Sequence, residues 1–306
     1  MGRVYVGILG ATGAIGECYR HLLHNHPYFE VKFLAASDKN IGVIVDGVEL
    51  CSVKDFARAG QLGVKIIFSA LDTTIAAGIE PEWAANFLVI SSSGAFRQKG
   101  KLIIPEINGE LVLGKKTGLF SKSNCTLQPI VLPLFWLQQW GIERVVATTF
   151  QAVSGAGKKG LGAMEILDNV IPYIAHEEEK IQEELGFFLH STPLDITCCR
   201  VAVTDGHTVA LTIDFTQKIT AEIIEKRFQE STTFHLFQEK NRPQPLLDRL
   251  LGGGMTIGVG RVRQGGVKGG ANTIQMVTLS HNRVRGSAGT EIKIAEIAYG
   301  FTKPGF

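Results

Sequence analysis

The sequence lacks the features that mark membrane proteins and disulfide-linked secreted proteins. No apolar run is long enough to span a bilayer, and no signal-peptide pattern precedes the first strand-like segment. Cysteine is scarce. The sequence has an odd number of cysteines, and none of them has CxxC spacing: Cys18, Cys51, Cys125, Cys198 and Cys199. We therefore expect free thiols, a reducing cytoplasmic location and no membrane partner.

Strong charge of either sign is also absent. The 31 basic and 29 acidic residues leave a net charge of +2, and basic residues form no run longer than two. Because such a chain has no extended positive field, we expect no nucleic-acid partner and a small-molecule substrate. The eight histidines are scattered, and His21, His24 and His26 have no cysteine or carboxylate companions at ligand spacing, so we expect no metal. Hydrophobic residues make up 45% of the 306 residues, enough for one large core or two domains.

A strand, a glycine turn and a helix follow one another near the N-terminus. Residues 4–9 are almost all apolar, which is typical of a strand buried on both faces of a parallel sheet. The motif Gly-Ala-Thr-Gly-Ala-Ile-Gly comes next and runs into helical spacing. Gly10 allows a tight turn, Gly13 lets the backbone approach phosphates, and Gly16 lets the helix pack on the strand. This order predicts a dinucleotide site at the helix N-terminus.

Further apolar strands at 31–36, 64–69 and 87–91 alternate with helical spacing. They predict an α/β fold with a Rossmann-type doubly wound parallel sheet. After residue 126 the strands are longer and alternate less strictly, which predicts a second α+β domain with a mixed sheet. The expected domains are residues 1–126, completed by a C-terminal helix within 287–306, and residues 127–286.

The second domain carries further local signals. Helical stretches are expected at about 161–170 and 176–186, with the acidic run Glu177-Glu178-Glu179 as a solvated helix face. Residues 197–215 show strand character throughout. Arg200 and His207 lie seven positions apart in this segment, and we expect them on one strand pair.

The end of the second strand bears on the choice of cofactor. In such folds it lies at the adenosine ribose, where an acid favours a free 2′-hydroxyl and a base favours a 2′-phosphate. The sequence offers both, in Ser37-Asp38-Lys39-Asn40. Because Ser37 and Lys39 can donate to a phosphate, we favour NADP(H).

A lone cysteine stands in a polar turn before the apolar run 129–137. Thr126 and Pro129 are helix-start signals, so we expect Cys125 at or just before a helix N-terminus. Backbone N–H groups and the helix dipole stabilise a thiolate at such a place. A buried structural cysteine fits this stretch equally well.

Together the motifs resemble the aspartate-β-semialdehyde dehydrogenase family along nearly the whole chain. The matching segments, in order, are Gly10–Gly16, Ala95–Arg97, Pro105–Asn108, Asn124-Cys125, Gln151–Gly157, Gly206-His207 and Val259–Arg263. The family uses NADPH to reduce the acyl phosphate of aspartate to the semialdehyde, a precursor of lysine, diaminopimelate, threonine and methionine. The resemblance implies the same oxidoreductase activity here, phosphate as co-substrate in the reverse direction, a catalytic and dimerisation role for the second domain, and a homodimer or a tetramer.

The resemblance also implies roles for individual residues. Cys125 would attack the acyl phosphate and hold the acyl group as a thioester that accepts hydride. His207 would act as acid and base, because an unperturbed histidine has a pKa of about 6.5, and Gln151 would orient the substrate beside the thiol. The implied substrate ligands are Arg200 for the α-carboxylate, Glu184 for the ammonium group, Arg97 for the phosphate, and Asn124. The implied cofactor contacts are Gly10, Thr12, Gly13, Ala14, Ile15, Gly16, Ser37, Lys39, Asn40, Ser154, Gly155 and Thr290.

Several positions depart from the family pattern. Phe187 stands where the family has a lysine that helps to bind phosphate, and losing one of two cations costs on the order of 1.5–3 kcal/mol unless another replaces it. The candidate replacements are Lys122, Lys158 and Lys159. The other departures are Lys122-Ser123 for Asn-Pro, Ser91-Ser92 for Asp-Asn, and Thr290 for the asparagine that the family offers to the nicotinamide.

Two alternatives stay open. A reductase of N-acetylglutamyl phosphate normally has Gly-Cys-Tyr around its cysteine, whereas this chain has Asn-Cys-Thr. A non-catalytic nucleotide-binding relative would serve as a partner or regulatory protein. Such relatives lose the nucleophile, and this chain keeps both Cys125 and His207.

Overall fold

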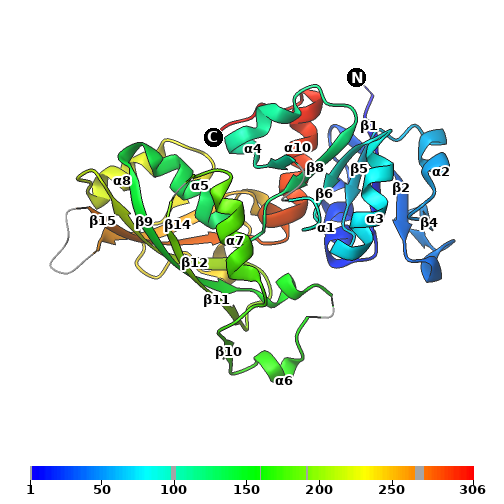
Figure 1. Cartoon of the computed structure of the whole chain (residues 1–306). Helices are drawn as coiled ribbons and strands as arrows, with labels where there is room; N and C mark the ends of the chain where they lie inside the picture. The colour runs from blue at the N-terminus through cyan, green and yellow to red at the C-terminus, as the bar shows by residue number, and fades with distance from the viewer. Residues whose placement is uncertain (1, 98–100, 159, 191, 266–271) are drawn as a thin grey trace. The chain divides into compact units, whose positions relative to one another are not determined.

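The structure is a computed structural model that describes residues 2–97, 101–158, 160–190, 192–265 and 272–306. It forms two compact units, and Figure 1 shows their helices and strands along the chain. Unit 1 combines Met1–Ser123 with Ser287–Gly305, and unit 2 combines Asn124–Gly286 with Phe306. The division expected from the sequence lay after residue 126, a few residues beyond this one.

Unit 1 is built on a sheet with the strand order β3-β4-β2-β1-β5-β6-β8-β7. Its strands are β1 (Val4–Leu9), β2 (Phe29–Ala36), β3 (Ile44–Val45), β4 (Val48–Ser52), β5 (Ile66–Ser69), β6 (Leu88–Ser91), β7 (Lys101–Ile103) and β8 (Gly118–Lys122). Neighbouring strands run parallel except β3 and β4. The doubly wound parallel sheet predicted from the sequence is confirmed.

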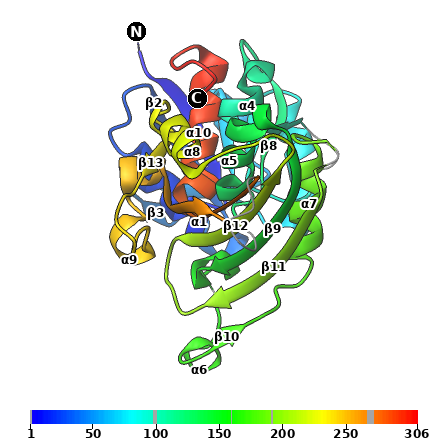
Figure 2. The same cartoon turned by 90° about the vertical axis from the view of Figure 1, so that its left-hand side faces the viewer.

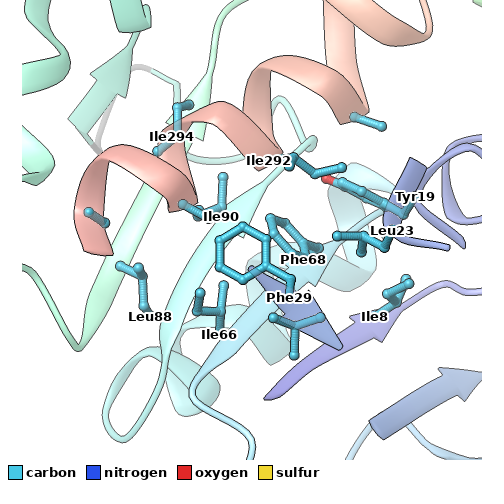
Figure 3. Packing of buried hydrophobic residues seen from close by; sticks show 14 of the residues in the cluster. Ile8, Tyr19, Leu23, Phe29, Ile66, Phe68, Leu88, Ile90, Ile292 and Ile294 are labelled. Carbon is cyan, nitrogen blue, oxygen red and sulfur yellow. The ribbon is translucent and has the colours of Figure 1, made fainter. Parts of the chain in front are cut away.

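Both faces of this sheet are buried, because successive side chains of a strand point to opposite sides. The helices of unit 1 are α1 (Ala14–Leu23), α2 (Phe56–Gln61), α3 (Thr73–Ala84), α4 (Pro105–Asn108) and α10 (Gly289–Tyr299). On one face Ile8, Phe68 and Ile90 pack in one cluster with Tyr19 of α1 and Ile292 of α10 (Figure 3). The cluster on the other face includes Leu9, Ile67, Val89 and Trp83 of α3.

Unit 2 is built on a mixed sheet with the strand order β10-β11-β9-β12-β15-β14-β13. Its strands are β9 (Ile142–Gln151), β10 (Val170–Ile171), β11 (Leu194–Val201), β12 (His207–Phe215), β13 (Phe234–Leu236), β14 (Ile257–Gln264) and β15 (Thr273–Ser280). β9 with β11 and β13 with β14 run parallel, and the other pairs antiparallel. The helices are α5 (Gln128–Leu137), α6 (Ala163–Ile166), α7 (Glu177–Gly186), α8 (Ala221–Gln229) and α9 (Pro245–Asp248). The predicted mixed sheet is confirmed.

The strand expected throughout 197–215 is broken. A turn separates β11 from β12, and Gly206 in it takes a φ of +104°, which favours glycine. The two strands are not neighbours, because β9 lies between them. The expectation that Arg200 and His207 share a strand pair is therefore wrong.

The segment before α7 also differs from its prediction. The helix expected at 161–170 is limited to the four residues of α6, and Val170 of β10 already pairs with Val201 of β11. Figure 1 and Figure 2 both show α6 and β10 extending away from the rest of unit 2. The exposed apolar side chains of this extension are Met164, Leu167, Val170 and Tyr173. Among the helices that the structure describes, none has the length and apolarity that a membrane span requires.

Candidate active site

The candidate catalytic residues of unit 2 meet at the thiol of Cys125. Its Sγ lies 3.5 Å from Nε2 of His207, the first residue of β12. The backbone N–H of Ala152 donates to Nδ1 of the same ring at 3.0 Å. Because Nδ1 accepts this bond, the neutral ring carries its proton on Nε2, which faces the sulfur. A hydrogen-bond donor in this position favours the thiolate.

The peptide group of Ala152 holds two functional side chains at once. Nη1 of Arg200, near the end of β11, donates to the carbonyl oxygen of Ala152 at 2.8 Å. Since β9 lies between β11 and β12, the residue that follows β9 reaches both Arg200 and His207. Burial lowers the pKa of Arg200, and the negative charge of Cys125 opposes this change. The guanidinium and the sulfur are therefore close enough to interact electrostatically.

Two glycines leave room for this cluster. A Cβ on Gly155 would lie 2.6 Å from Nη1 of Arg200 and 3.4 Å from Cε1 of His207. A Cβ on Gly286 would lie 2.6 Å from the Cβ of Cys125. The sequence predicted Gly155 only as a cofactor contact. It gave no signal for Gly286, because the residue that requires a glycine there, Cys125, is distant in the chain.

Carboxylates of α7 hold the turn that carries Cys125. The backbone N–H of Asn124 donates to Oε2 of Glu184 at 2.5 Å, and its side-chain amide donates to Oε1 of Glu177 at 3.1 Å. The Oδ1 of Asn124 accepts from the backbone N–H of Thr126 at 2.7 Å. The prediction that Glu177 belongs to a solvated face is wrong. Glu177 and Glu184 are seven positions apart, so they lie on the same face of the helix.

Gln151 and Ser154 flank Ala152 on the same loop. Gln151 is buried at the end of β9 and pairs in register with Arg200. The hydroxyl of Ser154 donates to Oδ1 of Asp205 at 2.8 Å, and Asp205 accepts two bonds from Arg283 at 2.6 Å each. Burial by itself raises the pKa of Asp205, but the bonds from Arg283 and Ser154 outweigh it and the pKa is below its usual value. This network was not predicted, because its members are distant in sequence.

In unit 1 the glycine turn has the shape that a dinucleotide site requires. Gly10 takes a φ of +77°, and a Cβ on it would lie 2.7 Å from the carbonyl oxygen of Ala70. A Cβ on Gly16 would clash with the carbonyl of Gly10. Gly13 is the N-cap of α1, and no side chain caps this helix. The backbone can therefore approach a pyrophosphate closely, and the residues present fit a dinucleotide.

The other candidate cofactor residues of unit 1 lie at strand and helix ends. Thr12, Ala14 and Ile15 are half-buried on the same turn as the glycines. Ser37 and Lys39 are exposed after β2, the neighbour of β1 in the sheet, and Nδ2 of Asn40 donates to Oγ of Ser37 at 3.2 Å. Thr290 is buried on the first turn of α10.

The candidate phosphate ligands belong to both units. Nη2 of Arg97 in unit 1 donates to the backbone oxygen of Ser92 at 3.0 Å. Among the candidate replacement cations, Lys122 is buried at the end of β8, Lys158 is exposed in unit 2, and Lys159 lies outside the described residues. Phe187 is exposed at the end of α7. Within the described ranges, no group of three or more His, Cys, Asp or Glu side chains is arranged to hold a metal ion.

The chain matches two family models, "Semialdehyde dehydrogenase, NAD binding domain" over residues 5–114 and "Semialdehyde dehydrogenase, dimerisation domain" over residues 131–285. It is 36% identical to an aspartate-semialdehyde dehydrogenase of Archaeoglobus fulgidus, over 96% of this chain and 98% of the relative. It is 33% identical to the aspartate-semialdehyde dehydrogenase of Saccharomyces cerevisiae, over 97% of this chain and 98% of the relative.

Solved structures with the same fold include two aspartate-semialdehyde dehydrogenases. The enzyme of Candida albicans with NADP superposes with a TM-score of 0.85 at 29% identity, over 97% of this chain and 99% of that one. Enzyme II of Vibrio cholerae, complexed with ASA, superposes with a TM-score of 0.87 at 26% identity, over 98% and 99%. The resemblance drawn from the sequence motifs is confirmed.

Proposed function

Because the chain belongs to the aspartate-semialdehyde dehydrogenase family, we propose that it catalyses the NADPH-dependent reductive dephosphorylation of L-4-aspartyl phosphate to L-aspartate 4-semialdehyde. The observation that carries this proposal is the 3.5 Å approach of Sγ of Cys125 to Nε2 of His207 on the fold of that family. The product would feed amino-acid biosynthesis, including that of lysine and diaminopimelate.

In the proposed reaction Cys125 acts as a thiolate, with Nε2 of His207 as its hydrogen-bond partner. The thiolate attacks the acyl carbon, and the bond from that carbon to the phosphate oxygen breaks as the thioester forms. NADPH, when bound, supplies the hydride that reduces this thioester. Because Nε2 of His207 faces the sulfur, acid–base exchange with the hemithioacetal oxygen takes place at that atom. Collapse of the hemithioacetal releases the aldehyde and returns the thiolate of Cys125.

We propose the substrate ligands from the resemblance of the sequence motifs to those of the family. Arg200 would grip the α-carboxylate, since a guanidinium forms two parallel bonds with a carboxylate. Glu184 would take the ammonium group, with Asn124 and Gln151 beside the thiol. Arg200 bonds to the loop that follows Gln151, and His207 connects the same loop to Cys125, which supports this set. Arg97 would bind the phosphate.

We propose NADP(H) as the cofactor. The turn from Gly10 to Gly16 would hold the pyrophosphate, and Ser37, Lys39 and Asn40 would bind the ribose 2′-phosphate. Thr290, Ser154 and Gly155 would lie near the nicotinamide. The exposed donors Ser37 and Lys39 and the uncapped start of α1 support this proposal, as does the similar enzyme of Candida albicans, whose structure was solved with NADP.

We also propose that the chain forms a homodimer through unit 2, which matches a dimerisation domain. The extension formed by α6 and β10 supports this, because it exposes Met164 at 91%, Leu167 at 60% and Tyr173 at 61% of their surfaces. The mass of the protein in solution, measured by light scattering, distinguishes a monomer, a dimer and a tetramer. A cytoplasmic location stays a prediction of the sequence.

The test is phosphate-dependent reduction of NADP⁺ by the purified protein with aspartate semialdehyde, followed at the nicotinamide absorbance band. NAD⁺ and N-acetylglutamate semialdehyde are run in parallel. Activity with aspartate semialdehyde and NADP⁺ that disappears in Cys125→Ser supports the proposal. Activity only with N-acetylglutamate semialdehyde, or a folded protein that binds NADPH and turns over neither aldehyde, contradicts it and favours one of the two alternatives.

A further inference from the structure

A buried carboxylate in unit 1 joins three segments that are distant in sequence. Glu291 lies on the first turn of α10 and is fully buried. Its Oε1 accepts from the hydroxyl of Ser92 at 2.7 Å, and its Oε2 accepts from the hydroxyl of Tyr19 on α1. Figure 3 shows Tyr19 beside Ile292, the next residue of α10. Ser92 also lies within hydrogen-bond distance of Ser287, with 3.1 Å between the two hydroxyl oxygens.

Ser92 connects this carboxylate to the candidate phosphate ligand. Its hydroxyl faces Glu291, and its backbone oxygen accepts from Nη2 of Arg97 at 3.0 Å. The hydroxyl of Ser93 accepts from the backbone N–H of Ala95 at 3.1 Å, so the segment between Ser92 and Arg97 is itself folded as a turn. A displacement of Ser92 would therefore move the acceptor that orients the guanidinium.

Glu291 also belongs to the electrostatic surroundings of two cations. Burial raises its pKa, while the ammonium of Lys122 and the guanidinium of Arg97 oppose the rise. Lys122 is only 4% exposed, and a buried cation is stable only near a negative charge or strong acceptors. Without the carboxyl of Glu291, two positive groups would lie in this part of unit 1 with less compensation.

The bond to Glu291 lies at a position that departs from the family pattern. Ser91-Ser92 stands where the family has Asp-Asn, and a serine side chain has one O–H where an asparagine offers a carbonyl oxygen and two N–H donors. The single O–H of Ser92 is given to Glu291. The turn is thus held by a contact between distant segments.

We propose that Glu291 is a positioning residue for phosphate binding: through its bond with Ser92 it fixes the guanidinium of Arg97. This inference depends on the proposed function, in which Arg97 is the phosphate ligand. Glu291 itself touches neither the substrate nor the reacting atoms.

The experiment measures the KM for phosphate in NADP⁺ reduction, with aspartate semialdehyde and NADP⁺ saturating. Glu291→Gln keeps the size of the side chain and loses the charge, and Ser92→Ala removes only the connecting hydroxyl. Each should raise the KM for phosphate by about 5- to 10-fold, the net effect of one ordinary hydrogen bond, because the change reaches Arg97 only through Ser92. The KM for NADP⁺ and kcat at saturating phosphate should change by less than about twofold. The double variant should be no worse than the more damaged single variant, because both changes break one connection.

A matched control is Glu80→Gln. Glu80 is a second buried carboxyl beside the same turn, but it accepts from Ser91 at 2.8 Å, and burial is the main influence on its pKa, with no cation contributing. The KM of the Glu80→Gln variant for phosphate should stay within about twofold of the wild-type value. If Glu80→Gln raises this KM as much as Glu291→Gln does, the turn is only generally loosened and the inference is wrong.

Arg97→Ala separates this inference from the proposed function. If that variant leaves the KM for phosphate unchanged, Arg97 is not the phosphate ligand. The proposed role of Arg97 and the positioning role of Glu291 are then both wrong. If Arg97→Ala raises it while Glu291→Gln and Ser92→Ala do not, only the positioning role of Glu291 is wrong. A failure of Glu291→Gln to fold leaves Ser92→Ala to decide, since the loss of one hydroxyl leaves the buried charge in place.

Discussion

Replacement of Gly155 by alanine should weaken aspartate-semialdehyde binding in a protein that still folds. A Cβ at this position would lie 2.6 Å from Nη1 of Arg200, where unstrained contacts are about 3.4 Å or longer. Arg200 would have to move back by about 0.8 Å. A shift of this size along its 2.8 Å bond to the carbonyl of Ala152 would lengthen that bond to about 3.6 Å, which is no longer a hydrogen bond.

The size of the effect follows from that bond. A hydrogen bond to a charged group contributes about 1.5–3 kcal/mol. A displaced guanidinium also meets a carboxylate with poorer bidentate geometry. Since 1.4 kcal/mol corresponds to a factor of ten, the KM for aspartate semialdehyde should rise about 10- to 100-fold. The value of kcat should fall less, because the new methyl group has ordinary van der Waals distances of 3.4 and 3.5 Å to His207.

Initial rates of NADP⁺ reduction, with aspartate semialdehyde varied at saturating phosphate, measure this KM. Gly186→Ala on α7 is the matched control, since no atom lies within 4 Å of a Cβ built there. Thermal unfolding of both variants checks that the fold is intact. A folded Gly155→Ala protein with an unchanged KM would refute the proposed role of Arg200 and the inference that a methyl group at position 155 displaces its guanidinium.

Three further predictions concern the same unit. Gly286→Ala should lower kcat at least about tenfold, because its Cβ would lie 2.6 Å from that of Cys125 and 3.0 Å from its Cα; normal single-turnover rates would contradict this. Arg200→Lys should raise the KM for aspartate semialdehyde far more than that for NADP⁺, because lysine cannot form two parallel bonds, and equal increases would argue against the carboxylate role. Asp205→Asn should lower the free energy of unfolding at pH 7 by about 1–3 kcal/mol. The pKa of Asp205 is lowered, so its contribution is present above the ordinary aspartate pKa and lost as the pH falls through the lowered value. Denaturant titrations from pH 7 to pH 3 should therefore show the wild type and the variant converging in acid.

Local sequence signals were enough for the centre of unit 1, since they predicted β1, β2, β5 and β6, but they did not predict β3, β4, β7 or β8. The turn at Gly10 and the start of α1 depend on residues that are neighbours in the chain, so periodicity and glycine spacing predicted them. The same holds for Cys125 just ahead of α5, because a helix start is a local event.

The contacts that complete the candidate site depend on strand order, which periodicity does not encode. Arg200 and His207 meet at Ala152 only because β9 lies between their strands, and Ala152 contributes only its peptide group. No side-chain pattern could reveal such a residue. Glu177 was wrongly assigned to a solvated helix face for a similar reason. Its partner Asn124 lies 53 positions away, and the pattern of charges along the helix contains no information about so distant a residue.

The order of the segments along the chain has a consequence for synthesis on the ribosome. α10 belongs to unit 1, but it is translated after every strand of unit 2. Until then, the apolar side chains that later pack in one cluster with Ile292, among them Ile90 and Phe68, lack that helix. The growing chain therefore carries an unfinished first unit while the second is being made, and such exposed surface is where chaperones bind and nascent chains aggregate.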